Sequence, residues 1–571
     1  MFILVFLTVF WVLAFLRVSW NVMIIGLGAV LVMGPWIIPM SHATFYLFYC
    51  PDILILLAFG VPFVRRKWLS GPLQRWVRRS LPPISQTEQE AIAAGDRWIE
   101  AELFQGQWNL KQQLKKSRAF LTQEEQNFID GPVKELCDLI NDWEIVHKGW
   151  QLPEKVWSFL KKNKFFGLII HKQYGGLGFS AYAHSTIVAK VAAKSPSAAV
   201  VTMVPNSLGP GELLMHYGTD EQKQYYLPRL ALGEEIPCFA LTGIDAGSDA
   251  SAMTDYGIVA KDDQGNIGIK LYWSKRYITL APVATLMGLA FKLYDPEHLL
   301  SDQVDRGITL CLISTKHPGV EIGRRHNPLG MAFPNGPTTG HGVFVPLSSV
   351  IGGPECIGQG WRMLVECLSV GRGLSLPSLA TAVGHLSSFH SAAYASIREQ
   401  FRTHIGAFEG ISEAIGTIGG LTYLLESGRL ETVSGIDAGL KPAVVSAIAK
   451  YHMTEMGRII INKAMDIHGG KAIIMGPRNR LAHVYIAAPI SITVEGANIL
   501  TRSLMIFGQG AIRCHPYLLQ EMNTASDDQL LSKFDKALVQ HLAYTSSNIV
   551  RGISGALTCG WVFHDATHYP E

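Results

Sequence analysis

The sequence is poor in the patterns that mark disulfide, metal and nucleotide chemistry. Its eight cysteines lie far apart, with no C-x-x-C pair and no Cys/His spacing suited to a metal. It therefore predicts reduced thiols rather than a disulfide framework. It also lacks an H-E-x-x-H segment, a Walker A loop and a G-x-S-x-G elbow. Zinc peptidases, P-loop enzymes and serine hydrolases carry those motifs, so none of these classes is favoured.

Charge is also scarce. Charged residues make up 17% of the 571 residues and the formal net charge is +3, while apolar residues reach 48%. A nearly neutral chain of this size gives no reason to invoke nucleic acid. The apolar content excludes a disordered chain and is enough for a large core and several domains.

The first 64 residues are the exception to this balanced composition. Residues 1–16 carry no charge, a second apolar run reaches Met40, and a third, Ala43–Val64, is interrupted by Pro51 and Asp52. These runs have the length of membrane spans. A signal peptide is the competing interpretation, but it would need a basic start and a small-residue cleavage site. We expect a retained anchor of two or three spans, because Asp52 is costly at the middle of a bilayer.

A basic segment, RRKWLSGPLQRWVRRSLPP, follows these runs. Cations beside an apolar span favour the cytoplasmic side of a membrane, and tryptophans favour its interface. The alternative is an ordinary solvated charged face. We expect the inner membrane as the location, with the remaining chain facing the cytoplasm. The residues concerned are Arg65, Arg66, Lys67, Trp68, Arg75, Trp76, Arg78 and Arg79.

The spacing of apolar residues along the rest of the chain changes twice. Helical spacing of apolar residues, with Thr122 and Glu125 as a plausible capping box, gives way to short runs typical of strands and then returns. This order predicts an α+β protein with a β domain between two helical ones. The expected parts are a 1–64 anchor, a 65–83 linker, an 84–237 helical domain, a 238–350 β domain, a 351–515 helical bundle and a 516–571 extension that stops early.

One acid stands in an apolar neighbourhood near the end of the bundle. The stretch SITVEGANILTRS contains Glu495 with Gly496 directly behind it. Burying an unpaired carboxylate is costly and raises its pKa. A surface turn, or an acid at the start of a helix, is the ordinary interpretation. The alternative is a base kept dry for chemistry on an unreactive C–H bond, and this stretch alone favours the ordinary interpretation.

Two glycine-containing segments are weaker candidates. The loop CFALTGIDAGSDASAM offers small residues whose backbone N–H groups and hydroxyls could cradle a phosphate or a ring edge. A plain connecting loop is the simpler interpretation. In DIHGG, Gly469 and Gly470 could just end a helix, and His468 alone is more often structural than a ligand.

Taken together, six segments in this order resemble the acyl-coenzyme A dehydrogenase family. They are FALTGIDAGSD, KRYITLAPVA, LVECLSVGRG, REQFRTHIGAFEGI, MDIHGGKAI and TVEGANIL. The resemblance covers about Thr122 to Pro516 and looks strongest to the long-chain, membrane-anchored members of enteric bacteria. It implies a helical N-terminal domain, a central β-barrel domain and a C-terminal four-helix bundle, here preceded by transmembrane helices.

By this resemblance Glu495 is the base that removes the α-proton of a fatty acyl thioester. Arg372 should lie near the acyl-coenzyme A. Some relatives carry the base directly before that arginine, where this chain has Gly371. Gly371, and Val494 in place of an aromatic ring, should leave room for a long acyl tail, although both could simply fit local packing.

The resemblance also implies an FAD site. Ser248 should lie near both flavin and thioester, and Arg398, Phe401 and Phe408 should reach the flavin of a neighbouring subunit. The flavin-lining residues implied in this way are Phe239, Ala240, Leu241, Thr242, Gly247, Ser248, Tyr277, Thr279, Arg398, Phe401, Phe408, Asp466, Gly469, Gly470 and Asn498.

Several positions depart from the family's pattern. The family's E-P-G is Gly243-Ile244-Asp245 here, and its tryptophan is Tyr277. Arg402 replaces the glycine after Phe401, and Ala497 replaces the threonine after the Glu-Gly pair. These changes put individual flavin contacts in doubt, though not the flavin itself.

The activity implied is FAD-dependent oxidation of medium- and long-chain acyl-coenzyme A to the trans-2-enoyl thioester, the first step of fatty acid β-oxidation. The expected electron acceptor is electron-transfer flavoprotein, and the expected assembly is a homodimer or homotetramer in contact with membrane lipid. Two alternatives remain: an acyl-coenzyme A oxidase that uses oxygen, and a membrane-held acyl-coenzyme A binding protein without catalysis.

Overall fold

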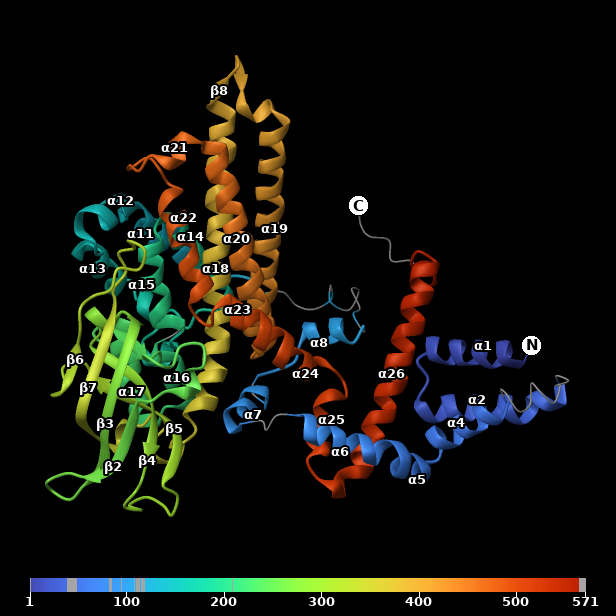
Figure 1. The fold of residues 1–571 in the computed structure, drawn as a ribbon. Helices are drawn as coiled ribbons and strands as arrows, with labels where there is room; N and C mark the ends of the chain where they lie inside the picture. The colour runs from blue at the N-terminus through green and yellow to red at the C-terminus, as the bar shows by residue number, and fades with distance from the viewer. Residues whose placement is uncertain are drawn as a thin grey trace. The chain divides into compact units, whose positions relative to one another are not determined.

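A computed structural model describes residues 2–563, apart from residues 38–48, 82–84, 94, 208 and most of 107–118. The chain divides into two compact units (Figure 1). Unit 1 comprises residues 1–84, 104–106 and 511–571, and unit 2 comprises residues 85–103 and 107–510. The two ends of the chain, which the sequence analysis treated as separate parts, thus belong to one unit.

Unit 2 begins with helices, as predicted. The capping box is confirmed, because the Thr122 side chain accepts from the Glu125 backbone N–H and the Glu125 side chain accepts from that of Thr122. The helices are α7 (Gln86–Ala93), α8 (Ile99–Phe104), α10 (Gln123–Phe128), α11 (Lys134–Leu139), α12 (Asp142–Glu144), α13 (Glu154–Lys162), α14 (Ala181–Lys194), α15 (Pro196–Ser207), α16 (Pro210–Tyr217) and α17 (Asp220–Leu232).

A seven-stranded sheet follows these helices. The strands are β1 (Pro237–Ala240), β2 (Tyr256–Lys261), β3 (Ile267–Thr279), β4 (Leu286–Tyr294), β5 (Asp305–Ser314), β6 (Val320–Ile322) and β7 (Asn335–Pro346). Their order is β1-β4-β2-β3-β7-β6, with β5 also paired to β4. The described strands form an open sheet, not the expected barrel, because the three-residue β6 pairs with β7 alone.

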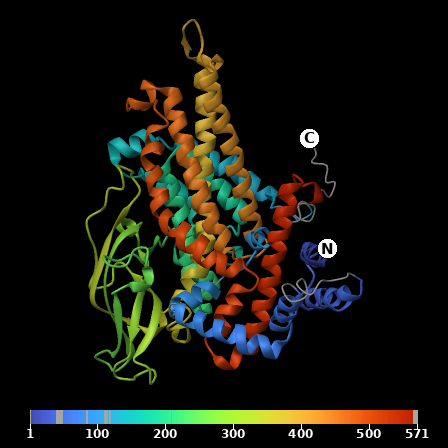
Figure 2. The same ribbon diagram turned by 45° about the vertical axis from the view of Figure 1, so that its right-hand side comes forward.

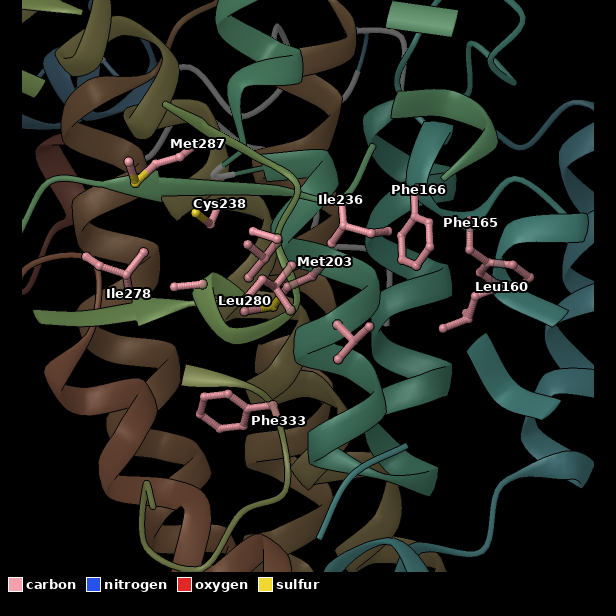
Figure 3. Packing of buried hydrophobic residues seen from close by; sticks show 14 of the residues in the cluster. Leu160, Phe165, Phe166, Met203, Ile236, Cys238, Ile278, Leu280, Met287 and Phe333 are labelled. Atoms are coloured by element: carbon pink, nitrogen blue, oxygen red, sulfur yellow. The ribbon is translucent and has the colours of Figure 1, made fainter. Parts of the chain in front are cut away.

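The N-terminal helices and the sheet share one hydrophobic core. Strand β4 is buried along nearly its whole length, which suits a central strand. Figure 3 shows Phe166 beside Ile236 and Phe165 beside Leu160 on the helical side, with Leu280 and Phe333 on the sheet side. The β domain is therefore fixed to the helices by apolar packing.

The bundle that completes unit 2 contains three long helices and several shorter ones. The long helices run side by side, and β8 and β9 form a hairpin at their tip (Figures 1 and 2). The elements are α18 (Gly360–Ile397), β8 (Glu399–Gln400), β9 (Thr403–His404), α19 (Glu409–Asp437), α20 (Ala443–His468), α21 (Gly470–Ile473), α22 (Ala482–Thr493), α23 (Asn498–Leu500) and the π-helical turn η12 (Thr501–Gly510).

Unit 1 contains the apolar start of the chain. Its helices are α1 (Phe2–Phe15), α2 (Trp20–Ile37), α4 (Cys50–Gly60), α5 (Pro62–Arg65), α6 (Gly71–Ser80), α24 (Ala511–Cys514), α25 (Leu518–Ala525) and α26 (Leu531–Leu557). No single helix in the described part of the chain is long and apolar enough to cross a membrane. The predicted transmembrane helices are therefore not supported.

The physical reason is that the apolar runs are broken. Helix α1 has 14 residues, or roughly 21 Å, against the roughly 30 Å of a bilayer core. Arg17 ends it in a left-handed conformation, with φ 55°. The part of the third run before Tyr49 lies outside the described residues. A bent pair, Ala482–Thr493 with Asn498–Cys514, passes the same length and composition test across a 46° bend.

Part of the basic segment forms ion pairs within unit 1. Arg65 is buried, and its Nε and Nη2 donate to the two carboxylate oxygens of Asp535 at 2.7 and 2.8 Å. Arg66 and Ser70 donate to the same carboxylate, at 3.2 and 2.7 Å. The sequence suggested that these cations face lipid, but Asp535, 470 residues further along the chain, takes up the charge of Arg65 instead.

Candidate functional site

Glu495 lies where helix α22 ends and the chain reverses. Val494 is extended, Glu495 has φ 56° and Gly496 has φ 91°. Gly496 adopts this left-handed backbone readily, as expected. This left-handed conformation costs a non-glycine residue about 1 kcal/mol, so the backbone at Glu495 is strained.

The buried Lys450 and the half-buried Arg372 donate hydrogen bonds to the carbonyl oxygens of this reversal. Arg372 Nε donates to the Glu495 carbonyl at 2.8 Å. Lys450 Nζ donates to the carbonyls of Ile492 and Gly496 at 3.0 and 2.7 Å. Thr501 Oγ1 donates to the same Gly496 carbonyl at 3.0 Å. The loop geometry is therefore fixed from α18, α20 and η12 together.

Asn498 supports the loop instead of facing outward. It is buried, its Oδ1 accepts from Lys450 Nζ at 2.6 Å, and its Nδ2 donates to Thr454 Oγ1 and Glu455 Oε1 at 3.1 and 2.8 Å. Because both ends of the amide are used within the chain, we assign Asn498 to positioning Glu495. The resemblance had placed it in the flavin site.

The Glu495 carboxylate is buried without a hydrogen-bond partner, unlike the polar side chains that support the loop. Both oxygens are closed off from solvent and neither has a hydrogen-bond partner, although the residue as a whole is half-buried. Burial raises the pKa of Glu495 to about 7, and the charges of Arg372 and Lys450 act against that rise. Burial also lowers the pKa of Lys450 to about 8. Near neutral pH the carboxylate can thus both lose and accept a proton.

Gly371 has a packing role that the sequence did not reveal. A Cβ at this position would lie 2.7 Å from the Ser207 carbonyl oxygen, so α18 passes the end of α15 too closely for any side chain. The space beside Gly371 is filled by protein backbone, not left open. Arg372 next to it touches Glu495, and contact of Arg372, Gly371 and Val494 with substrate remains a prediction.

The predicted flavin segment, Phe239–Ser248, begins in β1 and packs against α18. Phe239, Leu241 and Ala246 pack in one cluster with Leu364 and Cys367, just ahead of Arg372. The buried Lys275 fixes the loop, because its Nζ donates to the Leu241 carbonyl at 2.8 Å while pairing with Asp255 at 2.5 Å. The remaining predicted residues of this loop are Ala240, Thr242, Gly247 and Ser248, of which Gly247 and Ser248 are exposed.

Tyr277 and Thr279 end β3 beside this loop. Tyr277 has φ 63° and a largely exposed ring, over which Arg276 lies at 4.9 Å. Asn335 Nδ2 donates to the Tyr277 carbonyl and to Thr279 Oγ1, at 2.9 and 3.2 Å. The strand end is therefore held in an unusual conformation that presents an aromatic ring to the outside.

A second group of predicted flavin residues lies at the far end of the bundle. Arg398 ends α18, Phe401 and Arg402 turn the β8–β9 hairpin at φ 52° and 65°, and the Phe401 ring meets Phe408 at 6.1 Å. Asp466, Gly469 and Gly470 are exposed at the end of α20.

The two groups are widely separated within one chain. Twenty-six helical residues separate Arg372 from Arg398, which corresponds to roughly 39 Å. One dinucleotide cannot reach both ends of α18 in a single subunit. The contact of the tip residues with the flavin of a neighbouring subunit stays a prediction.

Sequence analysis missed the two buried lysines that support the site. Lys450 stands on an apolar stretch of α20, VVSAIAKYHM, and Lys275 stands at the end of β3. A lysine among residues that are otherwise buried is a signal, because its charge needs a partner there. Lys275 pairs with Asp255 and the Leu241 carbonyl, while Lys450 donates to two backbone carbonyls and Asn498, partners that no local residue pattern displays.

The arrangement is a sheet packed against helices with a dry carboxylate at a helix end, which is suited to accepting a proton. Family models of acyl-CoA dehydrogenases match four consecutive segments: the N-terminal domain (residues 123–234), the middle domain (238–341), the C-terminal domain (358–506) and the bacterial-type C-terminal domain (512–569). The chain belongs to the acyl-CoA dehydrogenase family, whose members are FAD-dependent oxidoreductases.

Individual relatives agree with this assignment. The chain is 29% identical to the 3-(aryl)acrylate reductase of Clostridium sporogenes over 333 residues, covering 58% of this chain and 83% of that protein. Butyryl-CoA dehydrogenase from Megasphaera elsdenii shares the fold, with a TM-score of 0.61 at 19% identity over 69% of this chain and 100% of that one.

A shorter match is closer in sequence. Protein HemX of Proteus mirabilis is 59% identical over 108 residues, which is 19% of this chain and 62% of that protein. The chain thus spans less than two thirds of the length of this relative. The substrate and the partners of this chain are therefore proposed below.

The residues present fit FAD. A Cβ at Gly247 would meet nothing within 4 Å, so the backbone of the loop is open to a ligand. Tyr277 offers an exposed ring nearby along the same sheet edge, and Glu495 offers a carboxylate without a protein partner. The loop Phe239–Ser248 and Tyr277 would hold the flavin ring, which when bound supplies hydride acceptance.

Proposed function

We propose that the protein oxidises the C2–C3 bond of long-chain saturated acyl-coenzyme A to the trans-2-enoyl thioester. The observation that carries the proposal is the Glu495 carboxylate, buried and without a hydrogen-bond partner beside Arg372 and Lys450. A structural carboxylate in this position would be paired. An unpaired one is suited to accept a proton from substrate.

The residues of the chain supply the proton chemistry. An α C–H beside a thioester is a weak acid, so the base must be strong and the developing enolate charge must be stabilised. Burial strengthens Glu495 as a base, while Arg372 and Lys450 keep enough positive charge nearby to leave it ionised close to neutral pH. Arg372 and Lys450 hold the carbonyls of the loop in place, and this also fixes the orientation of the backbone N–H groups in the same loop.

The preference for long chains is supported by the apolar lining of a cavity of about 70 Å³ in unit 2. Helix α22 lines it with the stripe Val484, Ala487, Ala488 and Ser491, which ends one turn before Glu495. Each methylene buried there contributes about 0.8 kcal/mol. This cavity, not Gly371, supports the proposed preference for medium and long chains.

The electron acceptor we propose is electron-transfer flavoprotein. One relative, 29% identical over 346 residues, is named as a subunit of a caffeyl-CoA reductase-Etf complex in Acetobacterium woodii. Its name, like that of the acrylate reductase, describes reduction, so both directions of the same bond chemistry need to be assayed.

The test is anaerobic titration of the purified flavoprotein with palmitoyl-coenzyme A. Loss of the yellow absorbance with formation of the enoyl product is expected. Glu495→Gln should still bind flavin and acyl-coenzyme A but lose turnover by several orders of magnitude. Substantial turnover by Glu495→Gln would mean that another residue takes the proton. Peroxide release in air would favour an oxidase, and unchanged colour would favour a binding protein.

We also propose that unit 1 attaches the protein to the cytoplasmic face of the inner membrane. Leu4, Ile25 and Phe63 are 72%, 70% and 76% exposed, and large apolar exposures of this kind mark an interaction surface. Trp68 and Trp76, also exposed, stand beside Arg75 and Lys67, which suits an anionic lipid interface.

Vesicle flotation tests this attachment. Protein with Trp68→Ala and Trp76→Ala should bind anionic vesicles several-fold more weakly than the unmodified protein. Tyr423→Ala, which removes an exposed aromatic ring from unit 2, should bind normally. Equal flotation of all three proteins, or none, would contradict a lipid-facing role for unit 1.

The homodimer or homotetramer expected from the sequence remains a proposal. Phe401, the most exposed large apolar residue of the described chain, turns the hairpin at the bundle tip. We infer that it packs on a second copy near its flavin. Phe401→Ser should reduce both the mass measured by light scattering and the flavin retained, whereas loss of neither would argue against this contact.

A further inference from the structure

The apolar cavity is followed by a second, polar one. We name them the apolar chamber, of about 70 Å³, and the polar chamber, of about 270 Å³. Pro196, Leu386 and Val484 line both. The two chambers are therefore adjacent, with apolar side chains at their boundary.

Helix α18 connects the reactive centre to both chambers along one face. From Arg372, which bonds the Glu495 loop, Leu379, Val383, Leu386 and His390 follow at spacings of seven, four, three and four residues. Such spacing keeps side chains on one side of a helix. From Arg372 to His390 this face runs roughly 27 Å, passing first the apolar chamber and then the polar one.

Helix α22 repeats the arrangement from the other side. Its stripe runs from Ser491, next to the Glu495 reversal, through the apolar chamber to Val484 at the boundary, and His483 lines the polar chamber. An acyl chain that starts at Glu495 and follows the apolar chamber therefore points its far end at the polar chamber.

The polar chamber is lined by cations without partners. Lys194 and Arg480 line it, and among the described residues neither forms an ion pair. The one acid in its lining is Asp142, whose oxygens accept from Ser195 Oγ and His483 Nδ1, each at 2.5 Å. The hydrogen-bonding capacity of that carboxylate is therefore used within the protein, and the lining holds two cations against one anion.

Arg480 and Lys471 stand near His390, which is itself uncharged near neutral pH. Burial lowers the pKa of His390, and the nearby His468, Arg480 and Lys471 lower it further. A methyl end would gain nothing from such surroundings, because apolar surface is stabilised only by leaving water. An anionic end would gain charge-assisted hydrogen bonds.

We propose that the site accepts long acyl thioesters whose far end carries a carboxylate, with Lys194 and Arg480 binding that carboxylate. This proposal rests on the proposed function, since it assumes that the acyl chain occupies the apolar chamber. It adds a substrate class, the coenzyme A esters of α,ω-dicarboxylic acids, to the unbranched monocarboxylic ones.

Matched substrates test it. We expect hexadecanedioyl-coenzyme A to show kcat/KM at least as high as palmitoyl-coenzyme A. In Arg480→Gln and Lys194→Gln the value for the dicarboxylic ester should fall roughly tenfold, the size expected for losing a hydrogen bond to a charged group. The value for palmitoyl-coenzyme A should change less than twofold. Equal effects on both substrates would overturn the proposal.

Two neighbours serve as controls. Arg478→Gln changes an arginine of the same loop that is exposed like Arg480, and Lys190→Gln changes an exposed lysine one turn before the half-buried Lys194. Neither residue lines the polar chamber, so neither variant should discriminate between the two esters. Discrimination by the controls as large as that by Arg480→Gln would mean that net charge alone is responsible.

Binding separates this proposal from the proposed function. Calorimetry on the Glu495→Gln protein should give tighter binding of the dicarboxylic ester, lost on adding Arg480→Gln. If palmitoyl-coenzyme A neither binds nor reduces the flavin, the proposed function fails first. If Arg480→Gln releases flavin, the cations serve the dinucleotide and the dicarboxylate proposal is wrong.

Discussion

At the residue scale, Glu495 combines two properties that oppose each other. Its oxygens are dry and unpaired, which favours the protonated acid, while Arg372 and Lys450 lie close enough to favour the anion. Desolvation is the larger effect, so the pKa settles at about 7. A free carboxylate, with a pKa near 4.3, would be a base weaker by more than two orders of magnitude.

The first prediction concerns pH. A base must be ionised to accept a proton, so kcat/KM should be low in acid, rise as pH passes about 7 and then level off. The apparent pKa of this rise reports Glu495 in the free enzyme. The measurement is kcat/KM for palmitoyl-coenzyme A between pH 5 and 8. A profile already flat at pH 5 would show that Glu495 is ionised at its ordinary pKa.

The second prediction concerns Lys450. Replacing it with methionine removes three hydrogen bonds to the reversal and one positive charge near Glu495. We expect kcat to fall by about two orders of magnitude, comparable to losing about 3 kcal/mol of positioning. The apparent pKa of kcat/KM should move upward, because Lys450 lowers the pKa of Glu495.

Thr454→Val is the matched control for Lys450. It removes the hydroxyl that accepts from Asn498 but leaves the lysine charge in place. Its activity should fall without a change in the apparent pKa. If Lys450→Met left the pH profile unmoved, its role would be purely structural.

At the scale of elements, a single carboxylate links three segments of unit 2. Glu366 on α18 accepts from Tyr217 at the end of α16, from Lys441 ahead of α20 and from Arg362 one turn earlier, at 2.7, 2.6 and 3.1 Å. Burial would raise the pKa of Glu366, but these donors outweigh it and lower the pKa to about 2. The network therefore stabilises the folded state only while the carboxylate is charged.

The third prediction follows from the lowered pKa of Glu366. Glu366→Gln should lower the free energy of unfolding by about 2 kcal/mol near neutral pH. Because the folded-state pKa is depressed, this difference should be complete above pH 4.5 and shrink as pH falls toward 2. Denaturant unfolding across this range measures it, with the exposed Glu355→Gln as a control. A pH-independent difference would point to lost packing instead.

At the scale of the whole molecule, the two ends of the chain form one unit around a buried ion cluster. Asp535 on α26 accepts from Arg65, Arg66 and Ser70, and residues 470 positions apart are joined there. Burial would raise the pKa of Asp535, but these hydrogen bonds and charges lower it. The extension at the C-terminal end is thus part of the same structure as the apolar N-terminal helices.

The fourth prediction tests this unit. Asp535→Asn leaves the buried Arg65 without its counter-charge, which costs about 3 kcal/mol. Scanning calorimetry should show the melting of unit 1 at a lower temperature, while the transition that releases flavin from unit 2 stays in place. Asp528→Asn breaks only the exposed pair with Arg78 and should have no measurable effect. A shift of both transitions would mean that the units unfold together.

The sequence by itself determined the order of the helical and β segments, and its resemblance to a family predicted Glu495 as the base. Periodicity of apolar residues placed helices before and after a run of strands, because that signal is local. The stretch around Glu495 was ambiguous alone, and only the six segments in order singled out its carboxylate. The sequence also indicated the glycine at position 496, whose φ of 91° the structure shows. Local patterns cannot, however, say which buried charge finds which partner.

Only the tertiary structure decided those partners. It placed Lys450 and Asn498 behind the Glu495 loop, gave Gly371 a packing role against Ser207, and used Arg65 for Asp535 instead of for lipid. It also broke the apolar start of the chain into helices too short to span a bilayer. Each outcome depends on contacts between segments far apart in sequence, where the cost of a buried, unpaired charge or of a steric clash selects the arrangement.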